Sequence, residues 1–183
     1  MIYFCSMCGH STQRIIPAGD THQRDVCTQT QCAFIHYENP KIIVGTLPIW
    51  KNKVLLCKRA IEPRKGYWTL AAGFMEMGET CEQGAHRETL EEAGAQVKLR
   101  QLLAVLSLPH TSQVHLFYSA DLIDGVFEAG LESLEVALFS YEDIPWTELA
   151  FATVTRTLEH YFSHADTPNM TQLVATIAPM NTD

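Results

Sequence analysis

The fold is decided by residues 73–95, which read GFMEMGETCEQGAHRETLEEAGA. Thr80 and Gln83 have the spacing of a capping box, in which each residue bonds the backbone of the other at the start of a helix. Gly94 stands where a left-handed residue commonly ends a helix. The segment therefore predicts a helix from about Cys81 to Ala93, preceded by a glycine-bounded loop.

Three carboxylates share one side of this helix. At ~100° per residue, Glu88, Glu91 and Glu92 fall within an arc of roughly 100°. Like charges so close raise one another's pKa unless a cation compensates. Hard divalent cations such as Mg²⁺ bind oxygen ligands of this kind. The pattern is compatible with a metal site, although acidic faces on solvated helices are common, so the flanking residues must decide.

The flanking residues resemble the Nudix box, GX5EX7REUXEEXGU, in which U is bulky and apolar. Seven fixed positions match at the required spacing: Gly73, Glu79, Arg87, Glu88, Glu91, Glu92 and Gly94. Thr89 and Ala95 depart from the pattern because they occupy U positions. Residues 68–73, WTLAAG, resemble the WxLPGG stretch that leads into the box.

This resemblance implies an α/β fold, the Nudix α/β/α sandwich with a mixed β-sheet. It implies that Glu88, Glu91 and Glu92, with the backbone carbonyl of Gly73, hold catalytic Mg²⁺ or Mn²⁺. It also implies a structural pair in which Arg87 binds Glu79 and fixes the loop to the helix. The implied reaction is attack by water on a nucleoside diphosphate linked to another group, X.

The general base of this reaction is left open by the sequence. Glu91 and Glu92 are candidates within the box. Glu135 lies before Val136-Ala-Leu-Phe139. This position resembles one at which related enzymes carry a late glutamate that binds metal or acts as the general base. Glu132 is the neighbouring alternative, and either residue could equally be an ordinary surface acid.

A second motif lies at the N-terminus, where Cys5-x2-Cys8 and Cys27-x4-Cys32 are separated by 18 residues. Two such pairs fit a four-cysteine structural zinc site. A segment of about 36 residues buries little core, so a metal ion has a physical purpose there. We therefore predict a closed zinc ribbon, with a redox pair or free thiols as alternatives.

The remaining pattern divides the chain into a ribbon (1–36), a Nudix hydrolase domain (37–165) and a C-terminal tail (166–183). Alternating and apolar runs predict strands, and Thr147 to His160 predicts a second helix. The tail is either a docking arm or disordered, and its sequence does not decide between the two. Strands are expected at residues 42–50, 54–58, 67–72, 101–107, 114–121 and 136–140.

The residues of the box do not determine which group X is attached to the nucleoside diphosphate. A ribbon before a Nudix domain resembles the NADH pyrophosphatases, but their SQPWPFPxS signature is absent after the box. The chain is more similar to a group of FAD and ADP-ribose pyrophosphatases, which release AMP plus FMN or ribose 5-phosphate. An NADH or other dinucleotide pyrophosphatase and a non-catalytic nucleotide sensor remain alternatives. Tentative substrate-binding residues are Arg59, Arg64, Phe74 and Tyr118.

Charge and composition restrict the partners. The chain has 13 basic and 21 acidic residues, a formal net charge of −8, which argues against a nucleic-acid polymer that needs many cationic contacts. No apolar run reaches the ~20 residues of a membrane span, and no signal peptide is recognisable. We expect a cytoplasmic protein that binds a small nucleotide and forms a homodimer.

Overall fold

The computed structural model describes residues 1–164 and 170–179. Its chain separates into two compact units, Met1–Asn39 and Pro40–Asp183. The boundary lies three residues beyond the one expected from the sequence, and each unit is described by itself below.

The N-terminal unit is a small antiparallel sheet. Its strands are β1 (Thr12–Ile15), β2 (Arg24–Cys27) and β3 (Ile35–His36), in the order β1-β2-β3. One buried acid lies in this sheet: Asp25 accepts hydrogen bonds from the backbone N–H of Ile2 at 3.0 Å and from Arg14 at 3.1 Å. Because a buried charge needs partners, these two bonds tie the N-terminus to the sheet.

The second unit is built on one mixed sheet, in the order β10-β5-β4-β9-β8-β11, with β6 paired to β5 and β7 paired to β4. Strands β4 and β9 run parallel, as do β8 and β11, whereas the other pairs are antiparallel. The strands are β4 (Lys41–Trp50), β5 (Lys53–Arg59), β6 (Trp68–Thr69), β7 (Ala72–Phe74), β8 (Val97–Leu108), β9 (Gln113–Leu122), β10 (Ser133–Phe139) and β11 (Leu173–Thr176).

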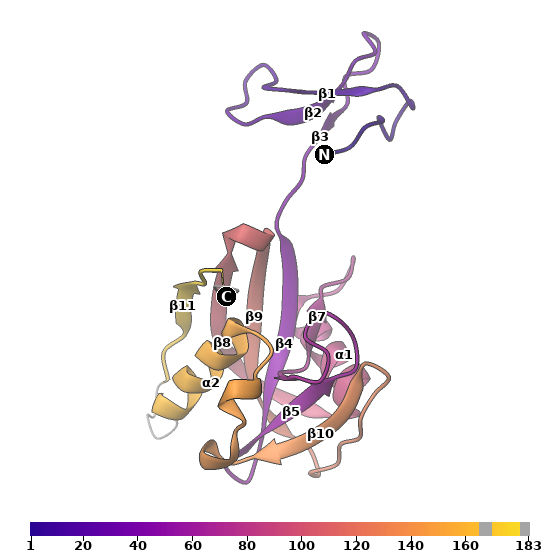
Figure 1. Cartoon of the computed structure of the whole chain (residues 1–183). Coiled ribbons are helices and arrows are strands. Elements are labelled where there is room, and N and C mark those ends of the chain that lie inside the picture. Colours follow the sequence, from indigo (N-terminus) through magenta and orange to yellow (C-terminus); the bar gives the residue numbers. More distant parts are fainter. Residues whose placement is uncertain (165–169, 180–183) are drawn as a thin grey trace. The chain divides into compact units, whose positions relative to one another are not determined.

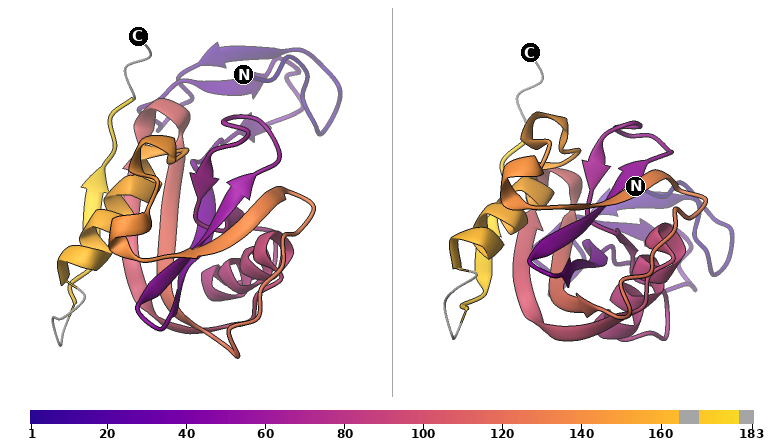
Figure 2. Two further views of the ribbon diagram at one scale, coloured as in Figure 1. Left: turned by 60° about the horizontal axis from the view of Figure 1, so that its bottom comes forward. Right: turned by 90° about the horizontal axis from the view of Figure 1, so that it is seen from below.

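Two helices, α1 (Cys81–Ala93) and α2 (Ala152–His164), cover opposite faces of this sheet. Along β4, Leu47 belongs to the core that contains Leu158 of α2. The preceding residue, Thr46, points to the other face and bonds Thr89 of α1 at 2.6 Å. Successive strand residues alternate between faces, so β4 lies between the helices, as Figures 1 and 2 show. The expected α/β/α sandwich is confirmed.

Three short 3₁₀ turns complete the described fold: η1 (Pro109–Thr111), η2 (Tyr141–Asp143) and η3 (Trp146–Glu148). The turn η3 occupies the segment where the second helix was predicted to start. That prediction was wrong at this end, because the helix begins at Ala152 and not at Thr147. Leu149 is extended and forms a bridge with Trp68, whose carbonyl accepts a bond from Ala150 at 2.8 Å. This tertiary pairing holds residues 149–150 out of the helix that their apolar spacing predicted.

Part of the C-terminal tail forms a strand. β11 lies parallel to β8, with Leu173 opposite Ala104, and Ile177 donates a hydrogen bond to the Ser107 carbonyl at 2.9 Å. Residues 173–177 therefore form a docking arm, which was one of the two alternatives. Residues 166–169 and 180–183 of the predicted tail lie outside the described part.

Within the described residues, no helix has the length and apolar character that crossing a membrane requires.

Candidate functional site

The predicted box helix has both predicted caps. Gln83 N–H donates to the Thr80 hydroxyl at 3.2 Å, and Thr80 N–H donates to the Gln83 side chain at 2.8 Å. Gly94 ends the helix in the left-handed region, at φ 56°, and its N–H bonds the Leu90 carbonyl. These caps define where the helix begins and ends, and so the direction in which its glutamates point.

Arg87 lies at the centre of the box. Its guanidinium donates two bonds to Glu79, at 2.8 and 3.1 Å, so the predicted pair is present and bidentate. It also donates to Glu88 at 2.7 Å, to Glu91 at 3.0 Å and to the Phe74 carbonyl at 3.1 Å. One arginine thus connects two points of the loop before α1, Phe74 and Glu79, with two of the three clustered carboxylates.

Glu88 lies directly against Gly73. A Cβ atom added to Gly73 would stand 2.4 Å from both carboxylate oxygens of Glu88, so only glycine permits this approach. Burial raises the pKa of Glu88, which the Arg87 bond opposes and the charges of Glu91 and Glu132 reinforce. The structure therefore brings two of the predicted metal ligands into contact.

Glu92 is the most enclosed of the three acids, with 7% of its surface exposed. Its carboxylate accepts one bond from the Ala72 N–H at 3.2 Å. Burial raises its pKa to about 8, and the charges of Glu88 and Glu132 act in the same direction. The neighbouring Cys57 thiol is neutral as well, because burial raises its pKa to about 12. A buried acid with so little compensation is the kind of group that a cation would stabilise.

The two late glutamates have different surroundings. Glu135 is 56% exposed at its side chain and pairs with Lys58 at 3.8 Å. Glu132, which was the alternative, is the residue whose charge acts on Glu88 and Glu92. Its carbonyl accepts a bond from Ala60 at 2.8 Å, which holds the loop beside β5.

The loop that carries Glu132 is tied to the end of α1, a contact for which the sequence contains no recognisable signal. Gly130 N–H bonds the Glu92 carbonyl at 3.0 Å, and Glu128 N–H bonds the Ala93 carbonyl at 2.8 Å. A Cβ atom on Gly130 would lie 1.8 Å from the Glu91 carbonyl oxygen. Glycine is therefore required for the loop to satisfy the last carbonyls of α1.

Of the four tentative substrate-binding residues, Arg59 lies near the carboxylates, since its charge lowers the pKa of Glu92 against the effect of burial. Phe74 is half exposed, with Lys41 above its ring at 5.0 Å. Arg64 stacks on Tyr67 instead. Tyr118 is buried beneath α1 and bonds Glu82 at 3.2 Å, which gives it a packing role in this structure.

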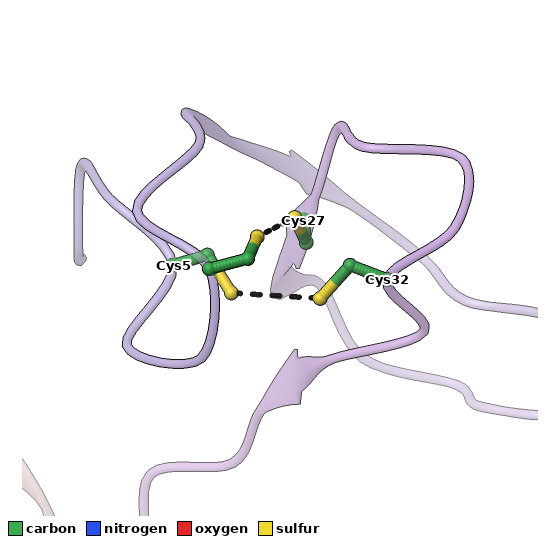
Figure 3. Close-up of side chains that lie close together, drawn as sticks. Cys5, Cys27 and Cys32 are labelled. Atoms are coloured by element: carbon green, nitrogen blue, oxygen red, sulfur yellow. Dashed lines mark hydrogen bonds between the residues drawn. The ribbon is translucent and has the colours of Figure 1, made fainter.

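The four predicted cysteine ligands come together in the N-terminal unit. The sulfurs of Cys5, Cys8, Cys27 and Cys32 all lie within 4.8 Å of one another. The sulfurs of Cys5 and Cys32 are 3.8 Å apart, and those of Cys8 and Cys27 are 3.4 Å apart. Figure 3 shows the labelled side chains of Cys5, Cys27 and Cys32 turned toward a common centre. Sulfurs around a tetrahedral zinc with bonds of ~2.3 Å are separated by about 3.8 Å. The donor set and its spacing therefore fit zinc.

Backbone donors support the same cysteines. Met7 N–H and Gln29 N–H each donate to the first sulfur of a pair, Cys5 and Cys27, at 3.4 Å. Gly9, at φ 76°, closes the first turn by donating to the Cys5 carbonyl at 2.9 Å. Such N–H···S bonds stabilise thiolates in a metal site.

Comparisons with known proteins agree with this geometry. Residues 40–161 match the family model described as NUDIX domain, and residues 3–38 match the one described as Nudix N-terminal, a zinc ribbon. The chain belongs to the Nudix hydrolase family. A crystal structure of a Nudix hydrolase from Nitrosomonas europaea has 50% identity and a TM-score of 0.91, and the match covers 96% of this chain and 99% of that one.

Two curated Nudix relatives are similar in sequence. An ADP-ribose pyrophosphatase from Methanocaldococcus jannaschii is 35% identical over 119 residues, which cover 63% of this chain and 69% of the relative. An NAD-capped RNA hydrolase NudC from Haemophilus influenzae is 34% identical over 173 residues, 86% of this chain and 58% of the relative. The chain spans about half the length of the NudC relatives that it matches.

The ribbon makes a prediction about metal removal. The purified chain should contain about one zinc ion, and a chelator should unfold the N-terminal unit because metal binding and folding are coupled there. Cys32→Ser should lower zinc content and abolish the ordered amide resonances of residues 1–39. Cys81→Ser, which alters a thiol outside the cluster, is the matched control and should retain the zinc. A metal-free ribbon with dispersed resonances would contradict this assignment.

The environment of Glu92 makes a prediction about pH. A carboxyl whose pKa is raised in the folded state stabilises folding below its unfolded pKa, and that stability is lost as pH rises through the folded value. The unfolding free energy of the protein freed of divalent cations at the box should therefore fall by a few kcal/mol between pH 5 and 8. Glu92→Gln should remove most of this fall, whereas Glu142→Gln, at an exposed acid, should not. Urea titrations at several pH values measure the unfolding free energy of each protein. The same change of this free energy with pH in all three proteins would disprove the prediction.

Proposed function

We propose that this protein is a metal-dependent pyrophosphatase that hydrolyses the diphosphate bond of a nucleoside diphosphate linked to X. The observation that carries the proposal is the cluster of Glu88, Glu91 and Glu92, which share one helix face beside the glycine at the start of the box. Burial raises the pKa of two of these acids, Glu88 and Glu92, and acids with such perturbed pKa values concentrate at functional sites.

Glu88, Glu91 and Glu92, together with the Gly73 carbonyl, would hold Mg²⁺ or Mn²⁺, since all the donors are hard oxygens. When bound, such ions neutralise phosphate oxygens and make an attacking water more acidic. Glu79 and Arg87 have a structural role in this proposal. Because Arg87 bonds Glu88 and Glu91 as well as Glu79, it restrains the carboxylates while the cation sites are formed.

The remaining roles concern water and substrate. We assign the late carboxylate that accepts a proton from water to Glu132 ahead of Glu135, because Glu135 pairs with Lys58. Arg59 lies near enough to influence Glu92 and is a candidate for binding a phosphate of the substrate. Phe74, half exposed beside Gly73, offers a surface on which a heterocycle can stack.

For X, we favour ADP-ribose or FAD, which would release AMP plus ribose 5-phosphate or FMN. The name of the Methanocaldococcus jannaschii relative supports ADP-ribose. A second candidate substrate is an NAD-type dinucleotide, free or at the end of an RNA, which the names of the NudC relatives favour. The net charge of −8 weighs against a polymer, and the predicted homodimer remains a prediction.

A substrate panel tests the function. With Mg²⁺ or Mn²⁺, the protein should release AMP from ADP-ribose or FAD faster than from NADH or NAD-capped RNA, measured by chromatography of the products. Glu92→Gln should lower kcat on the order of a hundredfold or more without loss of fold, because a ligand of the charge-stabilising cation is removed. Absence of turnover on all four substrates would overturn the proposal, and preferential turnover of NADH would favour the second candidate.

The two late glutamates provide a matched pair of variants. Glu132→Gln should lower kcat by roughly a hundredfold, the usual contribution of a general base, while KM changes little. Glu135→Gln, which loses only an exposed ion pair, should remain close to the unaltered protein. A larger loss of kcat in Glu135→Gln than in Glu132→Gln would assign the role of general base to Glu135.

A further inference from the structure

Among the described residues of the second unit, two buried side-chain atoms have no hydrogen-bond partner, His115 Nδ1 and Thr153 Oγ1, and His115 is the titratable one. His115 on β9 is 8% exposed, and its Nδ1 atom has no hydrogen-bond partner among the described residues. Its other ring nitrogen, Nε2, lies 3.2 Å from the side-chain oxygen of Gln113. Because that oxygen can only accept, Nε2 carries the proton, and Nδ1 is an acceptor with an unused lone pair.

The imidazole is neutral at physiological pH, since burial lowers its pKa to about 4. An acceptor buried without a donor costs free energy, which a hydrogen-bond partner would restore. Nearly all buried polar groups in proteins have such a partner, so this atom requires an explanation.

The sheet register relates His115 to the box. His115 lies opposite Ile43 on β4, and Ile43 lies opposite Phe74 on β7. Residues paired in this way project from the same face of a sheet, and strands lie about 4.8 Å apart. His115 is therefore two strands, roughly 10 Å, from Phe74 along one row of side chains.

This row begins at Phe74, next to the proposed metal ligand Gly73, and lies on the sheet face opposite α1, because the His115 ring packs against Phe117 of the core that contains Leu158 of α2. Phe74 directly follows Gly73, its carbonyl is held by Arg87 at 3.1 Å, and its ring is half exposed with Lys41 above it. In the part of the chain described, β7 pairs with β4 alone, so its other edge has no strand partner. A substrate whose diphosphate is held beside Gly73 on the α1 side would extend past the edge strand at Phe74, which brings its nucleoside toward Ile43 and His115 on the other face of the sheet.

We propose that His115 is a specificity-determining residue, whose Nδ1 accepts a hydrogen bond from an N–H group on a heterocycle of the substrate. The inference rests on the proposed function, and it names a substrate-recognition residue outside the box. The chemistry shared by the candidate heterocycles is a planar ring with an N–H donor, which is present as the amine of adenine and as the imide of a flavin. Gln113 acts as a positioning residue because it determines which ring nitrogen carries the proton.

Binding of two products distinguishes the heterocycles. AMP and FMN are titrated separately into the full chain with Mg²⁺, and the histidine ring nitrogens are followed by two-bond ¹H–¹⁵N NMR, with His115→Leu used for assignment. The ligand whose ring reaches the site should shift the Nδ1 resonance of His115 upfield, as expected for a nitrogen that accepts a hydrogen bond. If neither ligand changes that resonance although either one binds by calorimetry, the proposal is overturned.

Affinity measurements provide the second test. His115→Leu should weaken binding of the same ligand at least about tenfold, the effect of one lost hydrogen bond to a buried group, and His115→Gln should recover part of it. Ribose 5-phosphate, which lacks a heterocycle, is the control ligand and should bind both variants as it binds the unaltered protein. Equal weakening for all ligands would show a structural role only, and thermal unfolding of each variant establishes that it is folded.

These outcomes separate the inference from the proposed function. Because the NMR readout needs binding and no turnover, an upfield shift without hydrolysis would retain the role of His115 and reject the enzyme. Hydrolysis with an unchanged Nδ1 resonance would retain the enzyme and reject the role of His115.

Discussion

The second unit depends on how four carboxylates are compensated within two turns of helix and one loop. Arg87 supplies that compensation for three of them, because its planar guanidinium bonds Glu79 twice and also reaches Glu88, Glu91 and the Phe74 carbonyl. A lysine could not replace it, since a single ammonium cannot present donors in so many fixed directions. Glu92 lies outside this network and is the acid with the strongly raised pKa. The arginine therefore stabilises the loop and two of the clustered acids, and Glu92 lies outside its hydrogen-bond network.

The surrounding packing keeps this cluster in place. Gly84 allows α1 to approach β4, because a Cβ atom there would lie 2.7 Å from both Val44 and Glu79. Thr89, which departs from the bulky apolar residue of the box pattern, is completely buried and satisfied by Thr46 and the Ala85 carbonyl. At the far end of the helix, Gly130 brings the loop of Glu132 onto the last carbonyls. Small side chains thus determine how closely the sheet, the helix and the late loop meet.

The N-terminal unit is stabilised in a different way, because it is too small to bury a large apolar core. It contains three short strands, and few of its large apolar residues are buried. Four sulfurs at tetrahedral spacing take the place of a core, and backbone N–H groups turned toward two of them lower the cost of keeping thiolates together. Its two arginines, Arg14 and Arg24, are both paired with aspartates, so the ribbon offers little free positive charge for a nucleic acid.

The sequence by itself determined those features that depend on local spacing. The limits of α1 and its caps follow from residues close together in the chain, where helix geometry and turn chemistry are enough. The Glu79–Arg87 pair was expected from the resemblance to the Nudix box, and the grouping of the four cysteines from the spacing of their two pairs. Tertiary structure decided what depends on long-range pairing. Leu149 leaves the expected helix to bridge Trp68, residues 173–176 join β8 as a strand, and Tyr118 serves packing beneath α1. It also decided that the charge of Glu132 acts on Glu88 and Glu92 and that His115 shares a row with Phe74, because strand register and loop closure bring together residues that no local pattern connects.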